Sequence, residues 1–63
     1  MNLIEILKSF ENSLQHEIYN MIDEDYQREQ NNMPKENDIL ILAHCKRIYF
    51  INKELRKLMD NIV

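Results

Sequence analysis

A heptad pattern of apolar residues in the second half of the chain is the feature that most constrains the fold. Large side chains recur there in alternating steps of three and four residues, which places them on one narrow stripe of an α-helix. The positions of this stripe are Ile41, His44, Ile48, Ile51, Leu55, Leu58 and Ile62. Because such a stripe is normally covered by another helix, the pattern predicts helix–helix packing.

The first half of the chain carries a second helical pattern. Asn2 is a favourable N-cap, and Glu5 three residues later completes a capping-box arrangement. The apolar positions that follow are Leu3, Leu7, Phe10, Leu14, Ile18 and Met21. Asp25 falls near the centre line of the same stripe, and we expect the helix to have left the core by then, so that this carboxylate lies in water.

The segment from Asn31 to Pro34 marks the only break between the two patterns. Asparagine favours helix ends, and proline is favoured at the first position of a new helix, although Asp38 is an alternative start. The absence of glycine also favours helices over tight hairpins of strands. We therefore predict an all-α fold, an antiparallel helical hairpin with helices over about 2–31 and 34–62, in a single domain of residues 1–63.

A rival interpretation makes strands of residues 39–43 and 47–51, which are both rich in residues that favour β-structure. No turn residue separates these two segments, and residues 53–61 have a clear helical pattern. The helical hairpin is therefore the preferred prediction.

The chain is too short to bury a large core within one copy. Ordering 63 residues costs on the order of 95 kcal/mol, which a lone hairpin recovers only in part. The single cysteine, Cys45, provides no disulfide within one chain. We therefore predict a homodimer in which two hairpins form a four-helix bundle. Its expected core residues are Leu7, Phe10, Leu14, Ile18, Met21, Ile41, His44, Ile48, Ile51, Leu55, Leu58 and Ile62.

The sequence favours the cytoplasm and gives no reason to expect a membrane span. A lone thiol fits a reducing compartment, and no basic segment follows Met1. The longest apolar run, residues 39–43, is far too short to cross a bilayer. The net charge is −3, with seven acidic and two basic residues in 1–31 but four acidic and six basic residues in 32–63. Opposite balances favour pairing of the two helices in one orientation.

We expect no catalytic, cofactor-binding or metal site. The acidic residues Glu17 and Asp23 to Asp25 lack the Glu-x-x-His pairs of carboxylate metal centres, so a solvated acidic run is the preferred interpretation. His44 is either a pH switch or, as we prefer, a polar core residue that fixes the register. Cys45 is expected to be a buried, inert thiol.

Two surfaces remain as candidates for binding another macromolecule. The basic residues, with Tyr49 and Phe50 among them, suggest a nucleic-acid surface, but the acidic net charge favours a solvated helix face instead. These residues are Lys46, Arg47, Lys53, Arg56 and Lys57. The other candidate is an apolar patch of Ile39, Leu42, Tyr49 and Phe50, which is either part of the dimer core or a free surface for a protein partner.

With two helices of equal length, the heptad from Ile41 to Ile62 and the turn at residues 31–34, the chain resembles Rop-like hairpin proteins. It resembles equally the small dimeric hairpin proteins of archaeal spindle-shaped viruses, for which an adaptor role is considered. The likeness covers the whole chain and is architectural, without a signature motif. It implies a homodimeric four-helix bundle of viral or plasmid origin that acts in the cytoplasm. For a viral protein this would be the cytoplasm of the host cell.

The function expected from the sequence is that of a non-enzymatic adaptor or regulator. We expect it to bind itself and one further macromolecule, a protein in preference to a nucleic acid. The alternative implied by the resemblance is an RNA-binding regulator of the Rop type, which the acidic first half of the chain disfavours.

Overall fold

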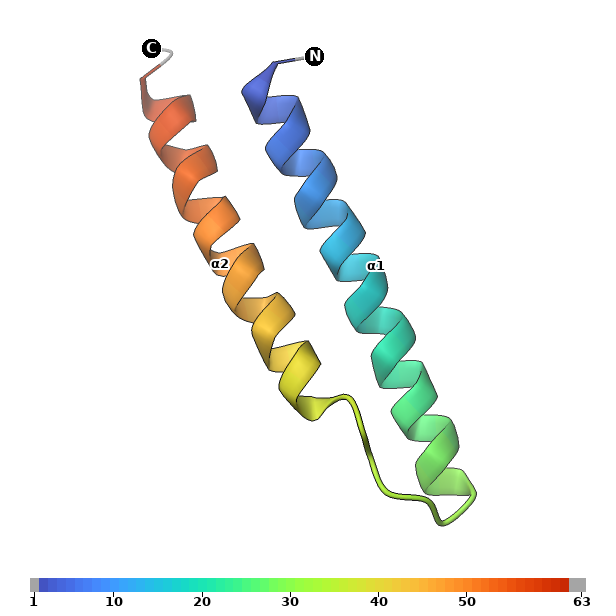
Figure 1. Ribbon diagram of the computed structural model, residues 1–63. Coiled ribbons are helices and arrows are strands. Elements are labelled where there is room, and N and C mark those ends of the chain that lie inside the picture. Colours follow the sequence, from blue (N-terminus) through green and yellow to red (C-terminus); the bar gives the residue numbers. More distant parts are fainter. Residues whose placement is uncertain (1, 62–63) are drawn as a thin grey trace.

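The chain forms two α-helices that lie side by side as an antiparallel hairpin. The computed structural model describes residues 2–61. Helix α1 spans Leu3–Gln30 and helix α2 spans Asp38–Asp60, and the loop that joins them lies at the end opposite the start of α1 (Figure 1). The predicted all-α hairpin is confirmed, and residues 39–43 and 47–51 are both helical. Ile62, expected in the core, lies outside the described residues.

Local hydrogen bonds explain both ends of α1. The side-chain oxygen of Asn2 accepts a hydrogen bond from the backbone N–H of Glu5 at 2.9 Å, as expected for an N-cap. At the other end, Asn32 has a left-handed backbone with φ of 59°. The N–H of Met33 donates to the Arg28 carbonyl at 2.8 Å, and the N–H of Asn32 donates to the Glu29 carbonyl at 3.1 Å. These two bonds form a Schellman motif, in which asparagine takes the place usually held by glycine.

Helix α2 begins near Asp38, the later of the starts that the sequence left open, and not at Pro34. It starts at Asp38, with Asn37 as the N-cap, so Pro34 lies in the loop and not at the first helical position. The backbone N–H groups of Glu36 and Asn37 donate to the Asp25 carboxylate on α1. Because these bonds hold the end of the loop against α1, residues 34–37 run along the first helix before α2 starts.

The contact between the helices follows one narrow line, which we call the seam. We define the seam residues as those that lie partly or fully buried at heptad spacing along each helix. On α1 they are Ile4, Leu7, Glu11, Leu14, Ile18, Met21, Asp25 and Arg28. On α2 and its N-cap they are Asn37, Ile41, His44, Ile48, Ile51, Leu55 and Leu58. The six described positions of the α2 heptad thus all face α1.

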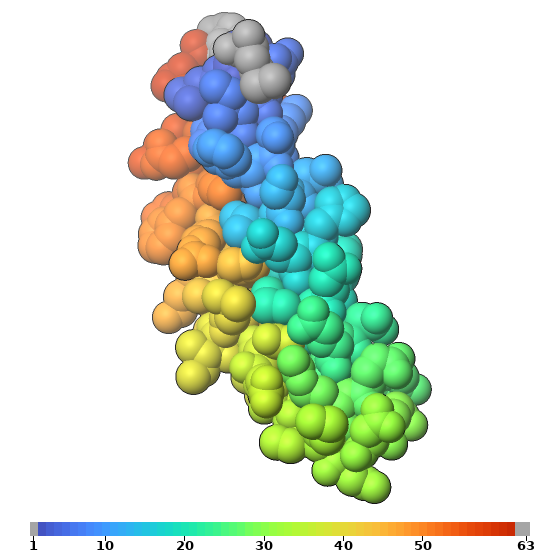
Figure 2. All heavy atoms as spheres, turned by 45° about the vertical axis from the view of Figure 1, so that its right-hand side comes forward, coloured from blue at the N-terminus to red at the C-terminus, as the bar shows by residue number. Residues whose placement is uncertain are grey.

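A single layer of two helices encloses very little. The molecule measures 52 by 19 by 12 Å, and its radius of gyration is 15.2 Å, against about 11 Å for a compact domain of this length. Among the described residues only Met21, Leu55, Asp25 and His44 are buried, whereas Phe10, Ile39 and many other large apolar side chains are exposed. Figure 2 shows the two helices packed along their length as an elongated body.

The Schellman motif predicts opposite preferences at two neighbouring positions. At residue 32 the left-handed backbone penalises a Cβ, so we expect Asn32→Ala to lower the free energy of unfolding by about 1 kcal/mol and Asn32→Gly to leave it within about 0.5 kcal/mol. At Gln30, the last helical residue, the order is reversed, with glycine about 1 kcal/mol worse than alanine. Urea unfolding at one fixed protein concentration measures these differences. The same order of glycine and alanine at both positions would contradict the motif.

Candidate interaction surfaces

The seam divides the surface of the hairpin into two broad faces. A residue that directly precedes a seam residue and one that directly follows it point about 100° to either side of the stripe. We call the side formed by the preceding residues, such as Phe10 and Phe50, the leading face. The side formed by the following residues, such as Lys8 and Arg56, is the trailing face. Because the helices are antiparallel, the preceding residues of both helices lie on the same side of the hairpin, and the following residues of both lie on the other side. The residues that line each surface hollow agree with this division.

An apolar groove crosses the middle of the leading face. It has a volume of about 440 Å³, and its accessible wall is almost entirely apolar. Both helices contribute to it through Phe10, Ser13, Leu14, Arg47, Phe50 and Ile51. Phe10 is 56% exposed and Phe50 is 61% exposed, so each aromatic ring presents much of its surface to solvent. The groove is therefore an apolar surface that the single hairpin leaves exposed to water.

The trailing face carries hollows of a different character. The larger one is lined by Lys8, Glu11, Asn12, Gln15, Asn52, Leu55, Arg56 and Met59. A second hollow lies nearer the loop and includes the charged residues Glu29, Lys35 and Asp38. One carboxylate oxygen of Glu11 is enclosed without a hydrogen-bonding partner in the part of the chain that the structure describes. Charged and amide side chains thus occupy both ends of the trailing face.

The structure divides the apolar patch considered from the sequence. Phe50 precedes a seam residue and lines the leading-face groove. Leu42 and Tyr49 follow seam residues and lie on the trailing side of α2, where they are 57% and 60% exposed. Ile39, at 86% exposure, projects from the outer side of α2. The Tyr49 and Phe50 rings touch edge to face, with centroids 5.6 Å apart, at the boundary between the two groups.

A polar contact lies in the middle of the seam. His44 is buried, and its Nε2 is hydrogen-bonded to the Glu17 carboxylate. Arg47 Nη1 lies 2.8 Å from His44 Nδ1. Because a guanidinium has only donors, Nδ1 is the acceptor, and the ring hydrogen on Nε2 donates to Glu17. His44 therefore links α1 to α2, with a polar partner at each ring nitrogen.

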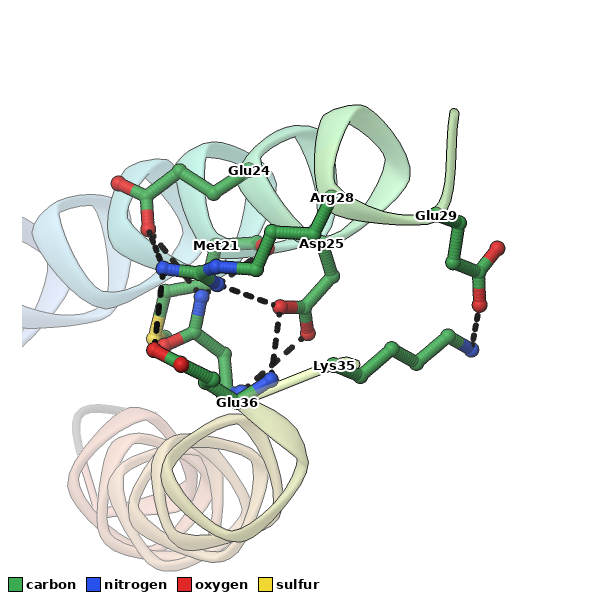
Figure 3. Close-up of polar contacts among 8 residues, drawn as sticks. Met21, Glu24, Asp25, Arg28, Glu29, Lys35 and Glu36 are labelled. Atoms are coloured by element: carbon green, nitrogen blue, oxygen red, sulfur yellow. Dashed lines mark hydrogen bonds and ion pairs between the residues drawn. The ribbon is translucent and has the colours of Figure 1, made fainter. Parts of the chain in front are cut away.

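A second polar cluster joins the end of α1 to the loop, and it corrects the expectation for Asp25. Only 4% of this residue is exposed, so its carboxylate is buried and not in water. Figure 3 shows the Asp25 carboxylate pointing towards the segment before α2. It accepts from Arg28 at 2.7 Å, from the Glu36 N–H at 3.1 Å and from the Asn37 N–H at 3.3 Å. The loop thus brings donors that compensate for burial of the charge.

These contacts also set the direction of the Asp25 pKa. Burial on its own raises the pKa of this carboxyl, but the hydrogen bonds from Glu36, Arg28 and Asn37, together with the Arg28 charge, outweigh it. The net pKa lies below the ordinary value of 3.8, so the carboxylate form is favoured in the folded chain.

Further polar contacts surround Asp25. Asn37 Nδ2 donates to the Met21 carbonyl at 3.3 Å and to Glu24 at 3.2 Å. Lys35 pairs with Glu29 at 3.1 Å, and this hydrogen bond and charge raise the pKa of the lysine (Figure 3). The loop is consequently fixed to α1 from several directions.

The other residues considered as chemical sites are dispersed. Cys45 is exposed on the trailing side of α2, which corrects the expectation of a buried thiol, because it directly follows the seam residue His44. Glu17 contacts His44, and Asp25 contacts the loop, so the acidic residues of α1 do not converge. Within residues 2–61 no group of three His, Cys, Asp or Glu side chains is placed to hold a metal ion. Neither α1 nor α2, as described, has the length and apolar character that a bilayer crossing requires.

The basic residues of α2 are partly engaged within their own chain. Arg47 contacts His44, as described above, and Lys57 lies 3.3 Å from Glu54. Lys53 Nζ sits 5.7 Å from the centre of the Tyr49 ring, within cation–π distance. These contacts occupy three of the cations that a nucleic-acid surface would require.

Sequence reasoning missed several seam residues. It placed Phe10 in the stripe, whereas within one chain Phe10 lies beside the seam and Glu11 is half-buried in it. It also missed the contacts of Glu17 with His44 and of Asp25 with the loop. The position of Asp25 on the centre line of the stripe was the signal for its burial.

Comparisons of the chain with family models, with curated proteins and with solved structures gave no significant match. The conclusions below therefore rest on the residues and the geometry of this chain.

The Asp25 cluster predicts a pH-dependent contribution to stability. A folded-state pKa below 3.8 means that the stabilisation is fully present above 3.8 and is lost as the pH falls towards the folded value. We expect Asp25→Asn to lower the urea midpoint at pH 7, and the difference from the unmodified chain to narrow below pH 3.8. Asp23→Asn, at an exposed carboxyl nearby, is the control and should shift the midpoint little. A difference for Asp25→Asn that is equal at pH 7 and pH 3 would contradict this account.

The His44 contact predicts that an apolar residue at this position would raise the free energy of unfolding but weaken the preference for one association state. His44→Leu completes the apolar heptad, and Glu17 and Arg47 are exposed in the single hairpin, so we expect the free energy of unfolding to rise by about 1 kcal/mol. We also expect more than one association state, because a polar seam residue fixes register. Urea unfolding and sedimentation velocity measure the two effects, with His16→Leu at an exposed site of α1 as the control. A loss of stability in His44→Leu would show that the polar contact is itself net stabilising.

Proposed function

We propose that this chain is a non-enzymatic adaptor or regulator that forms a homodimer, with two hairpins packed into a four-helix bundle, and binds another macromolecule. We take this macromolecule to be a protein. The observation that carries the proposal is the large apolar surface that a single hairpin leaves open, including the groove between Phe10 and Phe50.

The amount of open surface supports self-association. The chain exposes 5222 Å², whereas a compact monomer of 7.7 kDa exposes about 4,300 Å². The excess of about 900 Å² is close to the roughly 800 Å² that each partner buries in a standard protein interface. One further layer of protein on the hairpin would therefore bring its exposed surface to the ordinary value for its size.

The charges support a protein partner over RNA. The net charge is −3, and Arg47, Lys53 and Lys57 already contact side chains of their own chain. A surface that binds a phosphate backbone needs cations that are free to replace its counterions.

The hairpin architecture supports an affiliation with Rop-like proteins or with the hairpin adaptors of spindle-shaped viruses. We include in the proposal an origin on a plasmid or virus and action in the cytoplasm of the cell. Rop-type RNA binding is the alternative function within this architecture.

The solution mass tests the dimer directly. We expect light scattering to give about twice the chain mass of 7.7 kDa, and we expect this value to hold on dilution to low micromolar concentration. Dissociation at concentrations well above low micromolar, or a monomeric mass at every concentration, would overturn the homodimer.

Partner capture tests the adaptor role. The unmodified chain, immobilised in a lysate of the cell that produces it, should retain a defined protein. Tyr49→Glu, which places a charge on the trailing side of α2, should abolish that capture while the dimer persists. Tyr26→Glu, at an equally exposed tyrosine nearer the loop, is the matched control and should retain the partner. RNA retention that falls steeply with salt and depends on Lys46 or Lys53 would instead favour the RNA-binding alternative.

A further inference from the structure

We infer that the leading face is the dimer interface, so that the apolar groove between Phe10 and Phe50 is filled by a second copy of this chain. The inference rests on the homodimer proposed above and adds which face each copy buries. It assigns Phe50 to the interface and leaves Tyr49, Leu42 and Ile39 outside it.

The groove in the leading face has the composition of an interface centre. The groove is bounded by two aromatic rings, those of Phe10 and Phe50, with Leu14 and Ile51 between them. Interface cores are depleted of charged groups, and aromatic anchors supply much of the binding energy. The charged residue in the groove, Arg47, belongs to a type enriched in interfaces, and His44 already holds its guanidinium. Filling the groove therefore removes apolar surface from water, and Arg47 is the one charged residue among those that line it.

The two hollows of the trailing face would be costly to cover. Lys8 and Arg56 line its larger hollow together with Glu11, one of whose carboxylate oxygens finds no partner among residues 2–61. The second hollow of this face contains Glu29, Lys35 and Asp38. Covering these charged groups with another hairpin would remove their hydration. That hairpin would then have to supply partners of opposite charge to compensate.

The dimensions and symmetry of the hairpin fit this assignment. A face of 52 by 19 Å has a flat area of roughly 1,000 Å², enough for the roughly 800 Å² that each partner of a standard interface buries. A two-fold dimer uses the same patch on both copies. A two-fold axis that runs along the helices, or one that passes through the groove, places each groove opposite its own copy. The two grooves then close on each other.

Thiol accessibility distinguishes the two faces without disrupting either. The natural Cys45 reports on the trailing face, because it directly follows a seam residue and is exposed. Ser13→Cys, made in a Cys45→Ser background, reports on the groove that Ser13 lines. Both proteins are mixed with Ellman's reagent at a concentration at which light scattering shows the dimer.

We expect Cys45 in the folded dimer to react within about threefold of its own rate in the chain unfolded by 6 M urea. We expect the cysteine at position 13 in the folded dimer to react at least tenfold more slowly than it does in the unfolded chain. Protection of Cys45 with a freely reactive cysteine at position 13 overturns the face assignment while leaving the homodimer intact. Equal rates at the two sites in a dimer, whether fast or slow, also overturn it. A monomeric mass overturns the homodimer itself, so the two failures are distinguishable.

Charge insertion provides an independent test. We expect Phe50→Glu and Phe10→Glu each to raise the dimer dissociation constant at least 100-fold in sedimentation equilibrium. Tyr49→Glu, whose aromatic ring adjoins that of Phe50 but lies on the trailing side, should change it by less than threefold. Strong dissociation by Tyr49→Glu with a persistent Phe50→Glu dimer would overturn the assignment. If the phenylalanine variants lose helicity, the thiol rates above decide the question.

Discussion

The thickness of the hairpin is the constraint on which the rest of the structure depends. Two helices side by side form one layer, 12 Å through, and one layer covers each helix from a single direction. Seam residues such as Leu55 are enclosed, whereas Phe10 and Phe50, one position away from the seam, are left open. The exposed apolar side chains are thus the expected result of a single layer. They indicate which surfaces the molecule would cover by association.

Within that layer, polar contacts specify how the helices align. The seam contains His44 near its middle and Asp25 near its loop end, where a purely apolar stripe would tolerate sliding. Each of these side chains has a partner on its own helix, but its partner across the seam is in reach only in the observed alignment, since Glu17 reaches His44 and the loop N–H groups reach Asp25. A shift of one helical turn would leave the buried Asp25 carboxylate or His44 imidazole without its bonds across the seam. Burying the polar groups thereby selects one register over its neighbours.

The parts of the fold that the sequence predicted are those governed by local spacing. The heptad from Ile41 and the capping of α1 by Asn2 depend on residues a few positions apart. The start of α2 and the burial of Asp25 depend on a contact between residues 25 and 36, which no local pattern encodes. The choice between Phe10 and Glu11 at the seam also escaped prediction. Both fall within a stripe about 100° wide, and the partner helix decides which one it covers.

The two faces of the hairpin would allow the proposed dimerisation and the proposed partner binding to occur together. In the proposed dimer the leading faces are buried against each other, so the trailing faces form the two outer sides of the bundle. Each outer side then carries one copy of Tyr49 and Leu42. A two-fold dimer built in this way is bivalent by symmetry, and a partner with two matching sites would bind it more tightly than either site alone by the effective concentration of the second contact. The same apolar surplus that makes one hairpin incomplete would thus fix both the stoichiometry of the assembly and the separation of its binding sites.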